Sequence, residues 1–461
     1  MNGPDLEERI VEHLSKTGWD DLPEAAIEAA RRCIVDTFGV IVAGSSGDDI
    51  ERLVGWLERQ GGPPTASVLV YGTRLPAAGA AWANAAMTRA REFDDSHDPT
   101  GDHTSTPIFA AALAVAHLVG QVSGRDFLTA YVLAADLVSR LRLAPRKKVG
   151  GTGFAANTYA PFAAAIAAGW LLGLRGRVLY DALGWAYAQA AGAVQLQQSG
   201  NSALHIHHGL AAATGVQAAL MAREGFPGMQ GFLTGTFGLY NAYEGGEYDA
   251  SAVTAALGDR FEIEHVAVKQ YPSGRVTHGP IDAALALKRD GNLDAERVES
   301  VHVAYTAGGF NMTCEPEAQR RIAVNPQHAK FSLYYTVACA LARGHVGLED
   351  FTPEAVADPR VAELAAKVHV TVDPELKMIL PPGILTVRLR GGRELHSRVD
   401  HLKGSPENPV NFEDCANKLR ACLAFSARPL HRERVEAAIA SIAHLGATQD
   451  VGALATAFTT E

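Results

Sequence analysis

Acidic and histidine residues lie close together in the segment that begins Phe93-Asp94-Asp95-Ser96. His97 stands two residues after Asp95, and His103 stands eight residues after it. A carboxylate beside an imidazole can orient the ring and polarise it as a general base. Capping of a helix by one of the aspartates, with His97 in solvent, is the competing interpretation. We interpret Asp94, Asp95 and His103 as catalytic candidates.

A second group contains three histidines within four positions, His205-Ile206-His207-His208. At helical spacing His205 and His208 share a face, whereas His207 points elsewhere. This spacing does not match the usual zinc ligand pairs, although a metal-dependent hydratase that uses these histidines with Asp94 is an alternative. We predict no metal site, and we treat the three histidines as substrate-binding candidates.

A third group lies in Lys269-Gln270-Tyr271-Pro272-Ser273-Gly274-Arg275 and ends at His278. A Pro-Ser-Gly turn presents backbone N–H groups, and the nearby cations can bind a carboxylate. Lys269 and His278 are therefore catalytic candidates, and Ser273 and Arg275 are substrate-binding candidates. A surface loop with solvated cations is the alternative.

A pair of tyrosines, Tyr334-Tyr335, forms the fourth group. We expect one of them in the core and Tyr335 as a proton donor.

The composition excludes several functional classes. The chain has 461 residues, of which 47% are hydrophobic and 20% charged, a balance typical of globular proteins. Its 41 basic and 51 acidic residues give a formal charge of −10, which argues against nucleic-acid binding. The N-terminus is acidic, and the apolar runs are too short to cross a membrane. The five cysteines show no CxxC spacing, which favours the cytoplasm.

Periodicity predicts how the chain is organised. Helical patterns fill most of the first part of the chain, for example at residues 77–91 and 207–224. Strand patterns occur at the ranges 300–305, 368–372 and 385–389, and the last continues through Arg390-Gly391-Gly392-Arg393 as a hairpin. Helical patterns lie before and between these strands, at 281–288, 332–342 and 353–367. We expect a mainly α fold, with a large all-helical domain (1–265 and 403–461) and a smaller inserted α/β lid domain (266–402).

Taken together, the motifs resemble one family. FDDS…H, LHIHHG, KQYPSG…H, AKFSLYY and LKGSPENPV occur in this order, and the chain is thereby similar to the MmgE–PrpD family over nearly its whole length. Members of that family dehydrate, decarboxylate or epimerise small carboxylates. The resemblance implies a homodimer that uses neither metal nor organic cofactor. It also implies a set of site residues: Asp94, Asp95, His103, Lys269, His278 and Tyr335.

Two positions depart from the family pattern. The family usually has a histidine in a His-Pro-Thr segment, where this chain reads Gly153-Phe154-Ala155-Ala156-Asn157-Thr158. It also usually has a lysine at the position of Leu204. Both departures favour a substrate with fewer charges than the family's tricarboxylates.

The function that we expect is that of a cofactor-independent, dehydratase-type lyase acting on a small di- or tricarboxylate. His103 would abstract a proton next to a carboxylate. Lys269, Arg275 and His278 would stabilise the enediolate, and Tyr335 or His278 would return a proton. The alternatives are an epimerase or isomerase, a decarboxylase, and a catalytically reduced carboxylate-binding protein. No nucleic-acid or membrane partner is expected.

Overall fold

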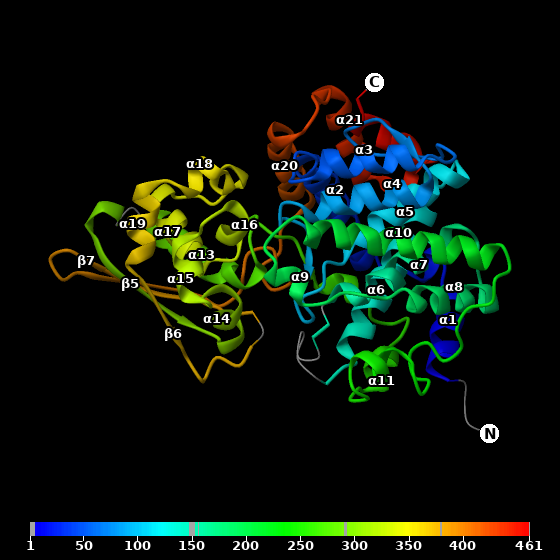
Figure 1. The fold of residues 1–461 in the computed structure, drawn as a ribbon, viewed down its shortest axis with the longest axis horizontal. Helices are drawn as coiled ribbons and strands as arrows, with labels where there is room; N and C mark the ends of the chain where they lie inside the picture. The colour runs from blue at the N-terminus through cyan, green and yellow to red at the C-terminus, as the bar shows by residue number, and fades with distance from the viewer. Residues whose placement is uncertain (1–4, 147–152, 155, 290–292, 379, 461) are drawn as a thin grey trace. The chain divides into compact units, whose positions relative to one another are not determined.

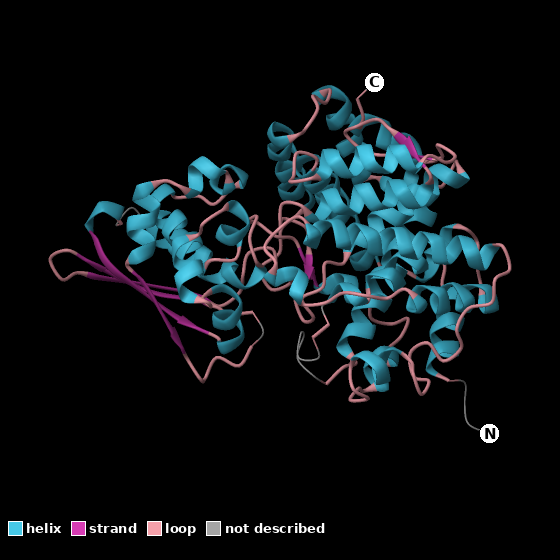
Figure 2. Ribbon diagram, viewed as in Figure 1, coloured by secondary structure: helices cyan, strands magenta, loops and turns pink. Residues whose placement is uncertain are grey.

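The computed structural model describes residues 5–146, 153–154, 156–289, 293–378 and 380–460 (Figure 1). Helices form most of it and strands are few, so the expected mainly α fold is confirmed (Figure 2). None of the helices in these described ranges is long and apolar enough to span a membrane. The chain divides into two compact units. Unit 1 comprises Met1–Ala90, Asp94–Val268 and Asn411–Glu461, and unit 2 comprises Arg91–Phe93 and Lys269–Val410.

Unit 1 is built almost entirely from helices. Its α-helices are α1 (Leu6–Lys16), α2 (Glu24–Gly44), α3 (Ile50–Gln60), α4 (Ala77–Arg89), α5 (Ser105–Val119), α6 (Gly124–Leu143), α7 (Ala160–Leu171), α8 (Gly176–Ala188), α9 (Gln195–Gln198), α10 (Ala203–Arg223), α11 (Leu239–Tyr243), α12 (Ala250–Thr254), α20 (Phe412–Cys422), α21 (Arg432–Ala443) and α22 (Val451–Leu454). Its short strands pair as β1 (Ala66–Ser67) with β2 (Arg74–Leu75), and β3 (Ser96–His97) with β4 (Val266–Ala267).

Small residues let α10 pack closely against its neighbours. A Cβ atom on Gly209 would lie 2.4 Å from the carbonyl oxygen of Trp82 in α4. A Cβ atom on Gly215 would lie 2.4 Å from the Cβ atom of Ala164 in α7. A larger side chain at either position would therefore push the helices apart. This close packing fixes the first two turns of α10, which carry the three histidines.

The C-terminal helices pack within unit 1. Lys418 of α20 forms a 2.8 Å ion pair with Asp36 of α2, and both side chains are largely buried. A Cβ atom on Gly39 would lie 2.7 Å from the Cα atom of Leu419, so α2 and α20 are also in close contact. The last part of the chain thus packs on a helix formed near its beginning.

Unit 2 combines a four-stranded sheet with helices. The strand order is β6 (Val368–Val372), β5 (Val298–Tyr305), β7 (Gly383–Leu389), β8 (Glu394–Val399). The β5–β6 pair is parallel and the other two pairs are antiparallel. Positive φ angles at Gly391 and Gly392 close the predicted β7–β8 hairpin. The α-helices of this unit are α13 (His278–Arg289), α14 (Ala307–Thr313), α15 (Glu317–Ile322), α16 (Pro326–Lys330), α17 (Leu333–Arg343), α18 (Pro353–Val356) and α19 (Pro359–Ala366).

The helix predicted over residues 353–367 is divided into two. The first helix, α18, ends at Val356, and α19 begins at Pro359. Asp358 caps α19 by accepting a hydrogen bond from the backbone N–H of Arg360. Proline lacks an N–H group and fits the first turn of a helix better than its interior, so Pro359 starts a new helix.

Candidate active site

The loop between α4 and α5 holds the first group of predicted residues. Two features fix its path: β3 pairs with β4, and the backbone N–H of His97 donates to the carbonyl of Asp102. His97 is fully buried, with Nδ1 2.8 Å from Oγ1 of Thr100 and Nε2 3.4 Å from Oε2 of Glu262. A solvent-exposed His97, as the capping interpretation assumed, is therefore wrong. The side chain helps to hold the loop.

Asp95 anchors the start of α5. Its Oδ1 accepts a 3.0 Å hydrogen bond from the backbone N–H of Ser105, and its Oδ2 accepts one from the Ser105 hydroxyl. Burial raises the pKa of Asp95 to about 7. No contact with an imidazole is seen for Asp95 in the described chain, so helix capping accounts for its position.

Asp94 is the carboxylate that contacts the candidate base. Its Oδ2 lies 3.0 Å from Nδ1 of His103 and accepts a 2.7 Å hydrogen bond from Thr106. A guanidinium nitrogen of Arg89 lies 3.5 Å from Oδ1. Asp94 is fully buried, whereas the side chain of His103 is 15% exposed. The contact with His103 is an ion-pair approach rather than a well-aligned hydrogen bond, which is common for catalytic groups without substrate.

This geometry defines which nitrogen of His103 can act. The negative charge of Asp94 favours a proton on Nδ1, the nitrogen that it approaches. The other nitrogen, Nε2, lies on the far side of the ring and is then the proton acceptor. A buried carboxylate that holds the tautomer of a general base is the arrangement found in catalytic triads.

His208 lies beside His103. The two ring centroids are 5.7 Å apart, and the rings meet edge to face. Burial, together with the charges of Arg89 and His103, holds the pKa of His208 well below its usual value. His208 is therefore neutral near pH 7, and its ring can serve as a hydrogen-bond donor or acceptor.

His103 and His208 share a small cavity. Its volume is about 20 Å³, which is room for roughly one water molecule. The cavity is lined by Asp102, His103, Thr104, Pro107, Val138, Asn157, Ala160, Ala163 and His208. All of these residues belong to unit 1.

Asp102 and Asn157 were not among the predicted site residues. Asp102 accepts a 3.1 Å hydrogen bond from Thr100, and Nε of Arg142 lies 3.3 Å from it. Burial raises the pKa of Asp102, although Arg142 opposes this effect. The position of Asp102 directly before His103 in the sequence is the one signal that could have indicated it.

Asn157 connects the cavity with His207. The Nδ2 atom of Asn157 lies 2.6 Å from Nδ1 of His207. An amide nitrogen is only a donor, so His207 accepts at Nδ1 and carries its proton on Nε2. Burial also lowers the pKa of His207. The Oδ1 atom of Asn157 is buried and has no hydrogen-bond partner among the described residues.

The three histidines of α10 therefore have three separate environments. His205 donates a 2.8 Å hydrogen bond to the carbonyl of Asp48, His207 contacts Asn157, and His208 lines the cavity. His205 is not among the cavity-lining residues. Only His207 and His208 are thus placed in or next to the cavity.

In unit 2, Lys269 is fully buried and pairs with Glu92. Its Nζ atom donates to Oε1 of Glu92 at 2.7 Å and to the carbonyl of Glu92 at 3.2 Å. Glu92 has a positive φ of 55°, a conformation that is uncommon for a residue with a side chain. The lysine that we expected to bind substrate therefore has a carboxylate partner within the protein.

The remaining residues of the third group form a buried cluster in unit 2. A guanidinium nitrogen of Arg275 lies 3.3 Å from Nδ1 of His278 and 3.2 Å from the carbonyl oxygen of Lys403. Because arginine is only a donor, the Nδ1 atom of His278 is an acceptor here. Ser273 pairs with Thr277 through their hydroxyl groups at 2.9 Å. Arg275 and His278 are thus brought together, whereas Ser273 supports the turn.

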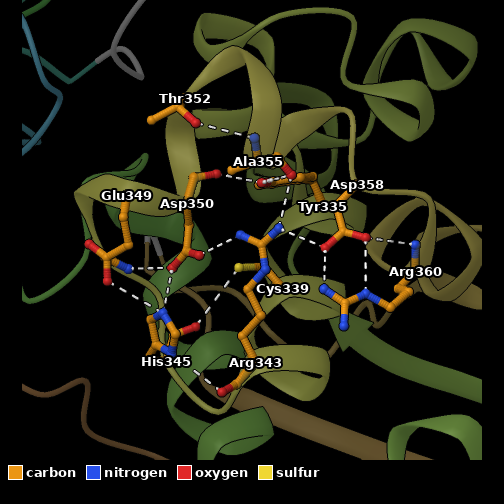
Figure 3. A network of polar contacts seen from close by, with 11 residues as sticks. Tyr335, Cys339, Arg343, His345, Glu349, Asp350, Thr352, Ala355, Asp358 and Arg360 are labelled. Atoms are coloured by element: carbon orange, nitrogen blue, oxygen red, sulfur yellow. Dashed lines mark hydrogen bonds and ion pairs between the residues drawn. The ribbon is translucent and has the colours of Figure 1, made fainter.

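Tyr335 does not fit its predicted role. Its hydroxyl donates to the carbonyl of Asp350 and lies 3.3 Å from the carbonyl of Ala355 (Figure 3). Arg343 lies between Asp350 and Asp358, at 2.5 Å and 3.2 Å. Burial also raises the pKa of Tyr335. A proton donor needs a hydroxyl that faces the substrate, and this one binds the main chain, so we leave Tyr335 out of the proposed site.

Comparison with known proteins identifies the family. Residues 8–251 match the MmgE/PrpD N-terminal domain, and residues 271–444 match the MmgE/PrpD C-terminal domain. The chain belongs to the MmgE/PrpD family. The resemblance inferred from the ordered motifs is therefore confirmed.

Curated relatives of this MmgE/PrpD protein cover most of its length. A cis-aconitate decarboxylase of Aspergillus terreus is 26% identical in an alignment of 438 positions that covers 89% of this chain and 88% of that protein. A cis-aconitate decarboxylase-like protein, oryM, of Aspergillus oryzae is 26% identical in an alignment of 460 positions that covers 92% of this chain and 91% of that protein.

The two departures from the MmgE/PrpD pattern bear on the chemistry of the cavity. Leu204, which stands where the family usually has lysine, is an apolar side chain with 5% of its surface exposed. In the segment that usually contains the family histidine, Asn157 is a polar side chain that lines the cavity. Ala155 of that segment lies outside the described residues. The cavity-lining side chain that the structure describes in this segment is thus an uncharged amide.

Proposed function

We propose that this MmgE/PrpD protein is a lyase that removes a proton next to a carboxylate group of a small carboxylic acid. The observation that carries the proposal is the 3.0 Å approach of the buried Asp94 carboxylate to Nδ1 of His103, in the wall of a cavity shared with His208. The names of the two relatives, both decarboxylase-type, support chemistry on small carboxylates.

In the proposed step, Nε2 of His103 takes the proton. The electron pair of the broken C–H bond moves toward the carboxylate and forms an enediolate, which needs nearby positive charge or hydrogen-bond donors. Asp94 stabilises the imidazolium that forms, as the acidic member does in catalytic triads. We retain Lys269, Arg275 and His278 as predicted contributors of positive charge, and Ser273 and His207 as predicted substrate contacts.

Elimination of water is the outcome that we favour. In that reaction the C–H bond next to the carboxylate breaks, its electrons form a C=C bond, and the β-hydroxyl leaves with a proton as water. The buried Oδ1 atom of Asn157 supports this choice, because a buried acceptor without a partner is unfavourable and a substrate hydroxyl is a suitable donor. A substrate of the cis-aconitate type has no hydroxyl to donate.

One further outcome uses the same proton abstraction, and another uses the same site to deliver a proton after a C–C bond breaks. Return of a proton to the other face of the carbon, without loss of a hydroxyl, would make the protein an epimerase or isomerase. Loss of CO₂ would make it a decarboxylase, as the names of the relatives indicate for those proteins. The intact Asp94–His103 pair favours catalysis over a purely carboxylate-binding role. We also propose that the enzyme is a cytoplasmic homodimer and that its reaction needs neither metal nor organic cofactor.

Turnover of a substrate panel tests this proposal. After dialysis against a chelator, the protein should convert at least one β-hydroxy di- or tricarboxylate to an unsaturated acid with release of water. Product analysis distinguishes the alternatives. Release of CO₂ indicates a decarboxylase, and inversion of configuration at a carbon without loss of water indicates an epimerase. Activity that returns only when a divalent metal is added would overturn the metal-independent reaction. A panel without any turnover would favour the binding protein.

A further inference from the structure

Histidines form a row across one face of the sheet in unit 2. Side chains alternate along β5, so that Val301 and Val303 are buried and His302 between them is exposed. His369 in β6 and His396 in β8 are exposed as well. Helices α13 and α17 contact the strands and share the buried core with Val301 and Val303, and Figure 2 shows helices packed along the sheet. The exposed histidines therefore lie on the face opposite this core.

The register of the strands places these histidines in one line. His302 is the direct partner of His369 on β6 and of Thr386 on β7, and Thr386 is the direct partner of His396 on β8. The rings of His302 and His369 stack, with centroids 5.2 Å apart and an angle of 22° between the planes. Neither ring takes part in a hydrogen bond or ion pair within the described ranges of the chain.

This geometry is suited to a metal ion that prefers nitrogen ligands. Imidazole is a good ligand for Zn²⁺, Ni²⁺ and Cu²⁺. Two imidazoles on adjacent strands can turn toward one ion, because exposed side chains change rotamer readily. His396 is two strands away from His302, roughly 10 Å, which is too far to share the ion. Its Nδ1 atom already lies 3.0 Å from the hydroxyl of Thr386.

We propose that His302 and His369 form a surface site for one late first-row divalent metal ion. The two imidazoles supply two ligands, and water completes the coordination. A bound ion would link β5 to β6, which is an edge strand of the sheet, and so stabilise unit 2. This site is independent of the lyase activity proposed above.

A competing location lies elsewhere in unit 2. His345, Glu349 and Asp350 place possible ligand atoms within 4.8 Å of one another. Asp350, however, already accepts hydrogen bonds from Arg343 at 2.5 Å and from the backbone N–H of Gly347 at 2.7 Å (Figure 3). The positive charge of Arg343 disfavours a cation at this position. The two locations can be distinguished by substitution.

Isothermal titration of the full-length protein, without a histidine tag, with ZnCl₂ at pH 7.5 tests the proposal. We expect one ion per chain and a higher melting temperature with zinc. His302→Asn and His369→Asn should each weaken binding at least about tenfold. The matched variants His396→Asn and His345→Asn should bind as the wild type does. Unchanged binding in His369→Asn, loss of binding in His345→Asn, or no saturable binding by the wild type would overturn the site.

Discussion

Replacement of His103 by alanine should lower kcat at least about 100-fold, because a general base contributes roughly 10²–10⁴ in rate. The fold should be retained, because the side chain is 15% exposed and borders a cavity rather than a packed core. Steady-state kinetics on the best substrate of the panel measure the loss. Circular dichroism and a melting curve confirm that the variant is folded.

The matched control for this experiment is His444→Ala, which removes an exposed imidazole from the same unit. It should retain wild-type kcat and KM. Added imidazole should partly restore the activity of His103→Ala, because the cavity is then large enough to hold a free base. A folded His103→Ala protein with a near-wild-type kcat would remove His103 from the mechanism.

Replacement of Lys269 by methionine should lower the free energy of unfolding by about 3–5 kcal/mol, because removal of one partner of a buried ion pair is strongly destabilising. Lys269 and Glu92 are both almost completely buried, and their charged atoms are 2.7 Å apart. Denaturation with urea measures the change. The double variant Glu92→Gln/Lys269→Met should recover much of the loss, since it removes both charges of the pair.

The double variant also tests whether Lys269 contributes to substrate binding. If the lysine contributes charge to the site, the folded double variant will show a higher KM and a lower kcat. Lys377→Met, which changes an exposed lysine of the same unit, should alter neither constant. Wild-type kcat and KM in the double variant would exclude a role of Lys269 in substrate binding and catalysis. An equal free energy of unfolding for Lys269→Met and the wild type would contradict a stabilising buried ion pair between Lys269 and Glu92.

Local patterns were sufficient to predict much of the fold. Helical periodicity located α10 and α17, and two adjacent glycines located the β7–β8 hairpin, because these features depend on neighbouring residues. The helix expected over residues 353–367 was wrong, because the aspartate and proline at 358–359 start a new helix in the middle of a helical pattern.

The site was harder to predict, because its contacts are long-range. The FDDS…H spacing indicated an aspartate–histidine pair, but not which aspartate contacts the ring. Asp94 contacts His103, whereas Asp95 binds Ser105 at the start of α5. The partner of Lys269 is 177 residues away in the chain, and no local pattern indicates such a pair. An isolated asparagine in a loop is usually a turn residue, so no sequence pattern indicates that Asn157 lines the cavity.

Reaction in deuterated water shows whether the protein abstracts a proton next to a carboxylate. The reaction of a substrate that the protein converts would be quenched at partial turnover. The remaining substrate and the product would then be examined by NMR. We expect the wild type to break the C–H bond next to the carboxylate, so that this proton is lost from the product or replaced by deuterium in recovered substrate. His103→Ala should show neither change. Conversion in which that C–H bond stays protiated in both substrate and product would contradict the proposed mechanism.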